Sequence, residues 1–327
     1  RRFNESDVYQ QIFDEIVLQA MRKKLVSGKT LYTDSTHLKA NANKNKWIKT
    51  RAANSSRDYL DALDLAVEED RLTHGKKPLP PRSSEPETRE IKQSTTDPDS
   101  GYMVRDGKPK GFFYLDHRTV DGRCNIITDV HLTPGNVHDS RPYLGRLDRQ
   151  KERFGFDVQS VGLDAGYFTA GICKGLEDRN IYGVISYRRP THRKGYFYKR
   201  EYRYDANQDR YTCPEGATLI YKTTDRNGYR HYRSDPERCW SCAQRYRCTD
   251  NAHGVKTLTR HIWEDSKERV NQHRLSAGGQ LIYQRRKETV ERSFADAKEL
   301  HGYRYARFRG LDRVKGQCLL AAAAQNI

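Results

Sequence analysis

The sequence lacks any apolar stretch of about 18 residues, the run that a membrane-spanning helix requires, and we therefore expect no membrane partner. It also lacks an apolar leader of the kind that directs secretion. Its first residue is Arg1 rather than Met, so we expect the chain to be part of a longer protein.

Acidic residues are in deficit: 43 Asp and Glu stand against 60 Lys and Arg, for a formal net charge of +17. An enzyme of small metabolites rarely needs this excess, whereas a protein that lies along a phosphate backbone gains from it through counterion release. Mere solubility is the alternative. Basic and aromatic residues alternate in residues 44–49, 182–204 and 303–309, which favours nucleic acid as the partner.

Cysteine is sparse outside one window, because four of the seven cysteines lie close together: Cys213, Cys239, Cys242 and Cys248. Such a cluster indicates a metal site rather than a disulfide framework. Two hairpin-like pieces that each offer thiolates would form a tetrahedral zinc site, which would stabilise a small polar segment with little core. Buried free thiols and a redox CxxC pair are the alternatives.

Apolar periodicity predicts an alternation of helices and strands. The expected helices cover residues 5–26, 57–72, 138–151, 168–179 and 264–300, and the expected strands cover residues 29–34, 111–116, 125–132, 160–164 and 182–187. Residues 74–100 are polar and Pro-rich, which predicts a linker or mobile loop. An antiparallel beginning that passes into a parallel βαβ half is the ribonuclease-H-like layout: an α/β fold with a mixed five-stranded sheet flanked by helices.

Three acidic residues occupy positions from which they could converge. Asp34 ends the first expected strand, Asp164 ends a later one, and Glu291 borders the apolar stripe of a late helix. Taken singly, a turn, a helix cap or an exposed helix charge explains each of them. Taken together they suit metal-assisted phosphoryl transfer, which needs hard oxygen ligands around two Mg²⁺ ions about 3.5–4 Å apart.

The chain resembles bacterial insertion-sequence transposases of the DDE type in three blocks, which are DSTHLKANAN at 34–43, VGLDAGY at 161–167 and ETVERSFADAK at 288–298. The resemblance implies a ribonuclease-H-like catalytic domain with a cysteine-containing, β-rich insertion that binds structural Zn²⁺. It implies that Asp34, Asp164 and Glu291 are catalytic and bind two Mg²⁺ or Mn²⁺ ions. The implied reaction is nicking at transposon ends, followed by attack of the freed 3′-hydroxyl on target DNA.

The third block and the basic runs also supply candidates for contacts with DNA: Lys39, Lys44, Lys46, Arg286, Lys287, Lys298, Arg304 and Arg307. In some relatives an Arg stands four positions before the Glu; that position is Lys287 here, and Arg286 lies one residue early. The block GNVHD at 135–139 also looks like a family feature. We expect Asp139 to cap the following helix rather than to act directly.

The expected domain organisation has four segments: a helical N-terminal remnant at 1–28, the first part of the catalytic domain at 29–189, a Cys-rich insertion at 190–262, and the last part of the catalytic domain at 263–327.

The expected partner is double-stranded DNA, both transposon ends and target, bound by a homodimer in the bacterial cytoplasm with the nucleoid. The alternatives are a ribonuclease-H-like nuclease that cuts without joining, a catalytically inactive DNA-binding relative, and a zinc-ribbon interaction module. The last would leave the three acids unexplained.

Overall fold

The computed structural model describes residues 6–53, 57–82, 88–104, 110–187, 189 and 191–327. The chain divides into two compact units. The larger comprises Arg1–Asn54, Glu87–Tyr187 and Ser266–Ile327, and the smaller comprises Ser55–Pro86 and Arg188–Asp265. The expected boundary between residues 189 and 190 adjoins residues 188 and 190, which lie outside the described residues.

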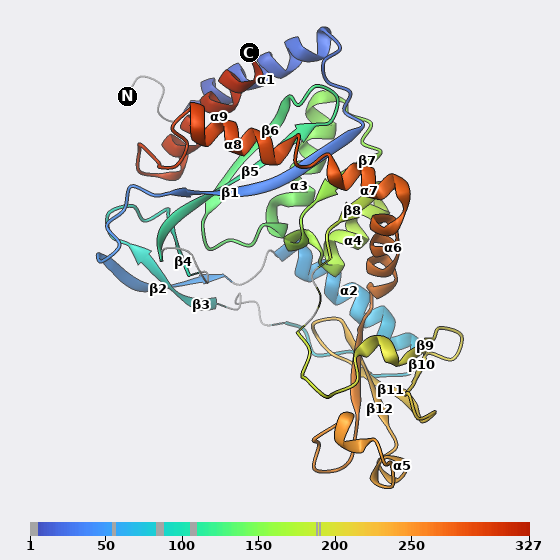
Figure 1. Ribbon diagram of the computed structural model, residues 1–327. Coiled ribbons are helices and arrows are strands. Elements are labelled where there is room, and N and C mark those ends of the chain that lie inside the picture. Colours follow the sequence, from blue (N-terminus) through green and yellow to red (C-terminus); the bar gives the residue numbers. More distant parts are fainter. Residues whose placement is uncertain (1–5, 54–56, 83–87, 105–109, 188, 190) are drawn as a thin grey trace. The chain divides into compact units, whose positions relative to one another are not determined.

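The larger unit is built on a mixed sheet, to which the described residues contribute eight strands (Figure 1). These are β1 (Thr30–Lys39), β2 (Trp47–Ala53), β3 (Thr88–Ser94), β4 (Gly101–Met103), β5 (Gly111–Asp121), β6 (Ile127–Pro134), β7 (Ser160–Leu163) and β8 (Tyr182–Ile185). The order is β2-β3-β4-β5-β1-β7-β8, and β6 also pairs with β5. Strand β1 runs antiparallel to β5 and parallel to β7, which runs parallel to β8.

The α/β class is confirmed, but the predicted count of five strands is wrong. Strands β2, β3 and β4 extend the sheet beyond β5. Strand β3 lies within residues 74–100, which we expected to be a linker or mobile loop, and residues 83–87 of that stretch lie outside the described residues. The prediction failed because β3 is polar and largely exposed, so no apolar alternation marks it as a strand.

Helices cover both faces of this sheet: α1 (Val8–Arg22), α3 (Ser140–Phe154), α4 (Ala170–Asp178), α6 (Glu264–Leu275), α7 (Ala277–Gln284), α8 (Val290–Leu300) and α9 (Leu311–Asn326). In β5, Arg118 donates hydrogen bonds to Ser293 of α8 and Gln325 of α9. Its neighbour Thr119 accepts one from Gln150 of α3. Because successive strand residues point to opposite faces, α8 and α9 cover one face and α3 covers the other.

The main core lies between these layers. It includes Phe13 and Val17 of α1, Leu31 of β1 and Leu319 of α9, all of which are buried. Helices α1 and α9 lie side by side in Figure 1, and Gly316 allows this approach because a Cβ there would lie 2.9 Å from the Tyr9 ring. None of the described helices is long and apolar enough to cross a membrane.

The smaller unit contains an antiparallel sheet in the order β13-β12-β11-β10-β9, together with α2 (Arg57–Thr73) and α5 (Pro236–Trp240). The strands are β9 (Arg203–Asp205), β10 (Arg210–Thr212), β11 (Thr218–Thr224), β12 (Tyr229–Ser234) and β13 (Thr257–His261). Helix α2 belongs here because its buried Asp70 accepts hydrogen bonds from Thr224 and Arg230 of the sheet. The Cys-rich segment is therefore joined by a helix from much earlier in the chain.

Candidate active site

The register of two parallel strands brings Asp34 and Asp164 together. Thr33 of β1 pairs with Leu163 of β7, so the next residue along each chain is an acid. The parallel pairing stops there, while β1 continues to Lys39 alongside β5. We had predicted that Asp34 ends its strand, but it lies within β1, which continues to Lys39. It does lie at the end of the parallel pairing with β7. The carboxyl ends of parallel strands are where α/β sheets open to ligands.

Gly162 makes room for the groups that pack beside these acids. A Cβ on Gly162 would lie 2.7 Å from Cδ1 of Tyr32 and 3.5 Å from Cγ of Arg286. The space beside Gly162 is occupied by a tyrosine ring and the stem of an arginine. Alternation along the strands then places Tyr32, Asp34 and Arg286 on one face of the sheet.

Asp164 follows β7 directly in an extended conformation and accepts a hydrogen bond of 2.9 Å from the backbone N–H of Gly166. Glu291 comes from the first turn of α8 and is 46% exposed. The helix predicted over 264–300 is divided into α6, α7 and α8. One division lies at Ser276, whose hydroxyl caps α7, and the other lies between Gln284 and Val290. The second break places Glu291 at a helix N-terminus, where the helix dipole favours a carboxylate.

Arg286 lies between two of the predicted acids. Its Nη2 is 2.6 Å from Oδ2 of Asp34, and its Nη1 is 3.6 Å from Oε1 of Glu291. The side chain is only 3% exposed. The contact of Arg286 with DNA stays a prediction; in the structure the turn after α7 directs the guanidinium inward toward the acids.

Asp139 is a fourth acid near the site, and its predicted role is wrong. It stands at the N-cap of α3, but its side chain makes no capping hydrogen bond. Its Oδ1 instead accepts a hydrogen bond of 2.9 Å from the hydroxyl of Ser35. A Cβ on Gly166 would lie 3.1 Å from Oδ1 of Asp164 and 3.3 Å from Oδ2 of Asp139, so the two carboxylates face each other across this glycine. The GNVHD block was the signal that could have identified it.

Electrostatics couple these groups. Burial raises the pKa of Asp34 to about 6, against the opposing attraction of Arg286, and the charges of Asp164 and Asp139 raise it further. Burial also raises the pKa of the Tyr167 hydroxyl, and the same three aspartates add to that shift. Four groups from β1, the start of α3 and the end of β7 therefore share one local field.

The donor chemistry of this site suits a divalent cation, because carboxylate oxygens are the ligands that Mg²⁺ and Mn²⁺ prefer. The positions of these acids suit a metal ion less well than their chemistry does. Within the part of the chain that the structure describes, no group of three or more His, Cys, Asp or Glu side chains is placed to hold a metal ion. Between Asp34 and Glu291 the positive charge is supplied by Arg286.

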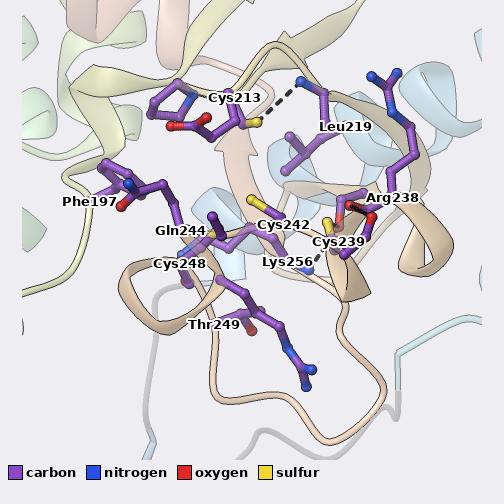
Figure 2. A pocket seen from close by; sticks show the side chains of 17 residues that line it. Phe197, Cys213, Leu219, Arg238, Cys239, Cys242, Gln244, Cys248, Thr249 and Lys256 are labelled. Atoms are coloured by element: carbon purple, nitrogen blue, oxygen red, sulfur yellow. Dashed lines mark hydrogen bonds between the residues drawn. The ribbon is translucent and has the colours of Figure 1, made fainter.

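The four clustered cysteines line a single cavity of about 310 Å³ in the smaller unit (Figure 2). Cys213 follows β10, Cys239 lies in α5, Cys242 follows that helix, and Cys248 follows a single 3₁₀ turn. All four are free thiols and half-buried. Burial raises the pKa of the Cys248 thiol, and the charges of Cys239 and Cys213 contribute to that shift. The structure therefore gathers the predicted cysteines, although not as a formed metal-ligand group.

Exposed basic residues gather beside the end of β1. The backbone N–H of Lys39 donates to the carbonyl of Arg304, and that of Ala306 donates to the carbonyl of Lys39. Buried Tyr303 and Ala306 anchor this segment, while neighbouring basic side chains stay in solvent. The basic surface, as defined here, consists of the exposed residues Lys39, Lys44, Lys46, Arg304 and Arg307. Of the other predicted DNA contacts, Lys287 is exposed and Lys298 is half-buried.

The larger unit is thus an α/β domain with a mixed sheet, acidic side chains at the end of its parallel strands and a basic surface that begins at the end of β1. A family model described as the transposase DDE domain matches residues 212–327, a little over a third of the chain. This match confirms the predicted resemblance to DDE-type transposases, which are enzymes that act on DNA and generally use divalent metal ions. The match includes Glu291, while Asp34, Asp139 and Asp164 precede it. A comparison with curated proteins finds no match.

Proposed function

We propose that this chain is the catalytic part of a DNA transposase, which cuts at transposon ends and joins the freed end to target DNA. The observation that carries the proposal is the parallel register that sets Asp34 beside Asp164. Glu291 supports it, because Arg286 links this third acid to the same place. The transposase family match provides independent support.

A ribonuclease-H-like core is part of this proposal. Its support is the strand order β6-β5-β1-β7-β8, in which an antiparallel hairpin is followed by parallel strands joined through α4. The catalytic domain would comprise residues 29–189 and 263–327 with the insertion at 190–262 between them, and residues 1–28 would form the helical N-terminal remnant. Helix α2, which contacts the sheet of the insertion, would join that part.

The residues that would hold two Mg²⁺ or Mn²⁺ ions are Asp34, Asp164 and Glu291. Such ions supply Lewis-acid activation of the attacking oxygen and stabilise the leaving oxygen at phosphorus. Water attacks in the first step and the freed 3′-hydroxyl attacks in the second, and each displacement breaks one P–O bond as it forms another. The chain's own contribution is to hold the carboxylates at fixed positions on β1, β7 and α8, with Asp139 holding Ser35 beside Asp34.

The basic surface would bind the DNA backbone. Lys39 lies on the same strand as Asp34, about 17 Å further along β1, a separation that a bound duplex can span. Lys287 and Lys298 flank Glu291 and would add contacts nearer the site. We further propose that two copies act together on double-stranded DNA in the bacterial cytoplasm with the nucleoid, because two transposon ends have to be joined to one target.

We also propose a structural Zn²⁺ ion in the smaller unit, held by Cys213, Cys239, Cys242 and Cys248. The shared cavity supports this, because four thiols from separate turns surround one space. The hydrophobic cluster beside the cysteines is small, with five buried members among the described residues, so a metal would supply stability that this cluster lacks. Thiolates in this number match tetrahedral zinc.

The test is nicking and strand transfer with the full-length protein and DNA that carries the element's ends, in Mg²⁺ or Mn²⁺. We expect both activities in the wild type and neither in Asp164→Ala, with DNA binding retained in the variant. Nicking without strand transfer would establish the nuclease alternative. Binding without cleavage in either metal would contradict the catalytic proposal and leave a DNA-binding relative.

A further inference from the structure

We propose that the guanidinium of Arg286 is an internal cation which occupies the space between Asp34 and Glu291 and withdraws when a divalent metal ion binds there. The inference rests on the proposed function, since it concerns the same carboxylates. It changes the predicted role of Arg286 from a contact with DNA to a competitor of the metal.

The geometry places one positive group against two acids from distant parts of the chain. Nη2 of Arg286 lies 2.6 Å from Oδ2 of Asp34, which is within hydrogen-bond distance, and Nη1 lies 3.6 Å from Oε1 of Glu291. A metal ion that binds both carboxylates needs these oxygens at about 2.0–2.2 Å. The guanidinium and the ion therefore require the same oxygens and the same space, and their like charges repel each other.

The burial of Arg286 shows that the guanidinium is held by charge rather than by a full set of hydrogen bonds. The side chain is 3% exposed, and its Nε is buried with no hydrogen-bond partner among the described residues. A buried donor that lacks a partner is unfavourable, so this position is not the best-satisfied one available to the side chain. The carboxylates that hold the guanidinium here are the same carboxylates that a metal ion would bind.

The backbone around Arg286 is held in place, which restricts the change to the side chain. The carbonyl of Arg286 accepts hydrogen bonds from the N–H of Glu291 and from the hydroxyl of Thr289. The stem lies beside Gly162, and the guanidinium lies 5.5 Å from the Tyr283 ring centroid. Withdrawal therefore requires rotation of one side chain, while Glu291 keeps its position at the start of α8.

Asp34 is hydrogen-bonded to Arg286 through Oδ2, an oxygen that a metal ion would also need. Removing the guanidinium should free both carboxylates. The metal-free protein would then bind a divalent ion more tightly, because no cation has to be displaced first.

The experiment measures Mn²⁺ binding to the DNA-free protein by titration calorimetry and by electron paramagnetic resonance. We expect Arg286→Gln to bind Mn²⁺ about tenfold more tightly than the wild type, because the ion no longer has to displace a cation from the two carboxylates. Arg285→Gln is the matched control: it removes the same charge one residue earlier, where the side chain is exposed and donates to the carbonyl of Gly122. It should bind Mn²⁺ as the wild type does.

Arg286→Lys provides a second variant if the Gln variant does not fold. It keeps the charge but can make only a single-point contact, so its Mn²⁺ affinity should exceed that of the wild type by a smaller factor. Unchanged or weaker Mn²⁺ binding in the folded Arg286 variants would overturn the inference. The proposed function would survive that result if Asp164→Asn, made in the wild-type protein, weakens Mn²⁺ binding. If Asp164→Asn leaves Mn²⁺ binding unchanged in the wild type and in the Arg286 variants, both the inference and the proposed function are overturned.

Discussion

Nη2 of Arg286 lies 2.6 Å from Oδ2 of Asp34, although 252 positions of the chain separate the two residues. This contact joins the turn between α7 and α8 to strand β1. Nη1 of the same guanidinium lies 3.6 Å from Oε1 of Glu291, five residues after Arg286. One ion pair thus connects the late helix with the acidic end of the sheet.

The position of Asp139 predicts that Asp139→Asn reduces cleavage without abolishing it. The carboxylate holds the hydroxyl of Ser35 and faces Asp164 across Gly166. Loss of its charge should lower the rate of nicking by about 10- to 100-fold, the usual effect of removing a group that orients a metal ligand. Asp157→Asn, at an exposed loop position, is the control and should cleave at the wild-type rate. An unchanged rate in Asp139→Asn would restrict Asp139 to a structural role.

The raised pKa of Asp34 predicts a specific pH dependence of stability in the metal-free protein. Its folded pKa of about 6 exceeds the ordinary 3.8, so the folded state holds the proton more tightly than the unfolded state. The contribution of Asp34 to stability is therefore largest below about pH 4 and is lost as the pH rises to about 6. Relative to Asp34→Asn, the wild type should lose up to about 3 kcal/mol of unfolding free energy across this window.

Chemical denaturation in EDTA at a series of pH values measures this difference. The comparison with Asp34→Asn removes the contributions of the other titrating groups, which both proteins share. A difference that stays constant from pH 4 to pH 7 would contradict the assigned burial of Asp34. Metal binding should show the opposite trend and strengthen as the pH rises through about 6, because the ion needs the carboxylate.

The shared cavity of the four cysteines predicts that Cys239→Ser loses most of its bound zinc. We expect about one zinc ion per chain in the wild type and a loss of roughly 3 kcal/mol or more in the stability of the smaller unit in the variant. Elemental analysis and chelator-dependent unfolding measure the two effects. Cys124→Ser is the matched control because Cys124 is exposed and lies outside the cluster. A wild type that is free of zinc and insensitive to chelator would reject the zinc proposal.

The basic surface predicts a salt-dependent loss of DNA affinity in the double variant Lys44→Gln/Arg307→Gln. Both side chains are exposed, and each lost phosphate contact should reduce the slope of log affinity against log salt by about 1. Fluorescence anisotropy over a range of salt concentrations measures this slope. Lys23→Gln, after α1, is a control for the loss of an exposed charge elsewhere on this unit. If the double variant keeps the wild-type slope, DNA lies on another surface.

Local pattern was enough to predict much of the fold. The pattern of apolar and β-forming residues predicted strands at the positions of β1, β5, β6, β7 and β8. The polar strand β3 was missed because most of its residues are exposed or half-buried, so apolar and polar residues do not alternate along it. The break before α7 was missed because the sequence suggested one continuous helix, whereas the backbone leaves the helical conformation and is extended at Ser276.

The sequence by itself supplied the candidates for the chemistry: three acids in transposase-like blocks, a cysteine cluster and an excess of positive charge. These depend on residue type and short spacing, which a linear sequence displays. The tertiary structure alone decided how these groups meet. The β1–β7 register sets Asp34 beside Asp164, the turn after α7 directs Arg286 inward, and Ser35 draws Asp139 away from capping α3. Each of these depends on contacts between residues far apart in the chain, and their energies are set by burial and distance, which only the folded chain defines.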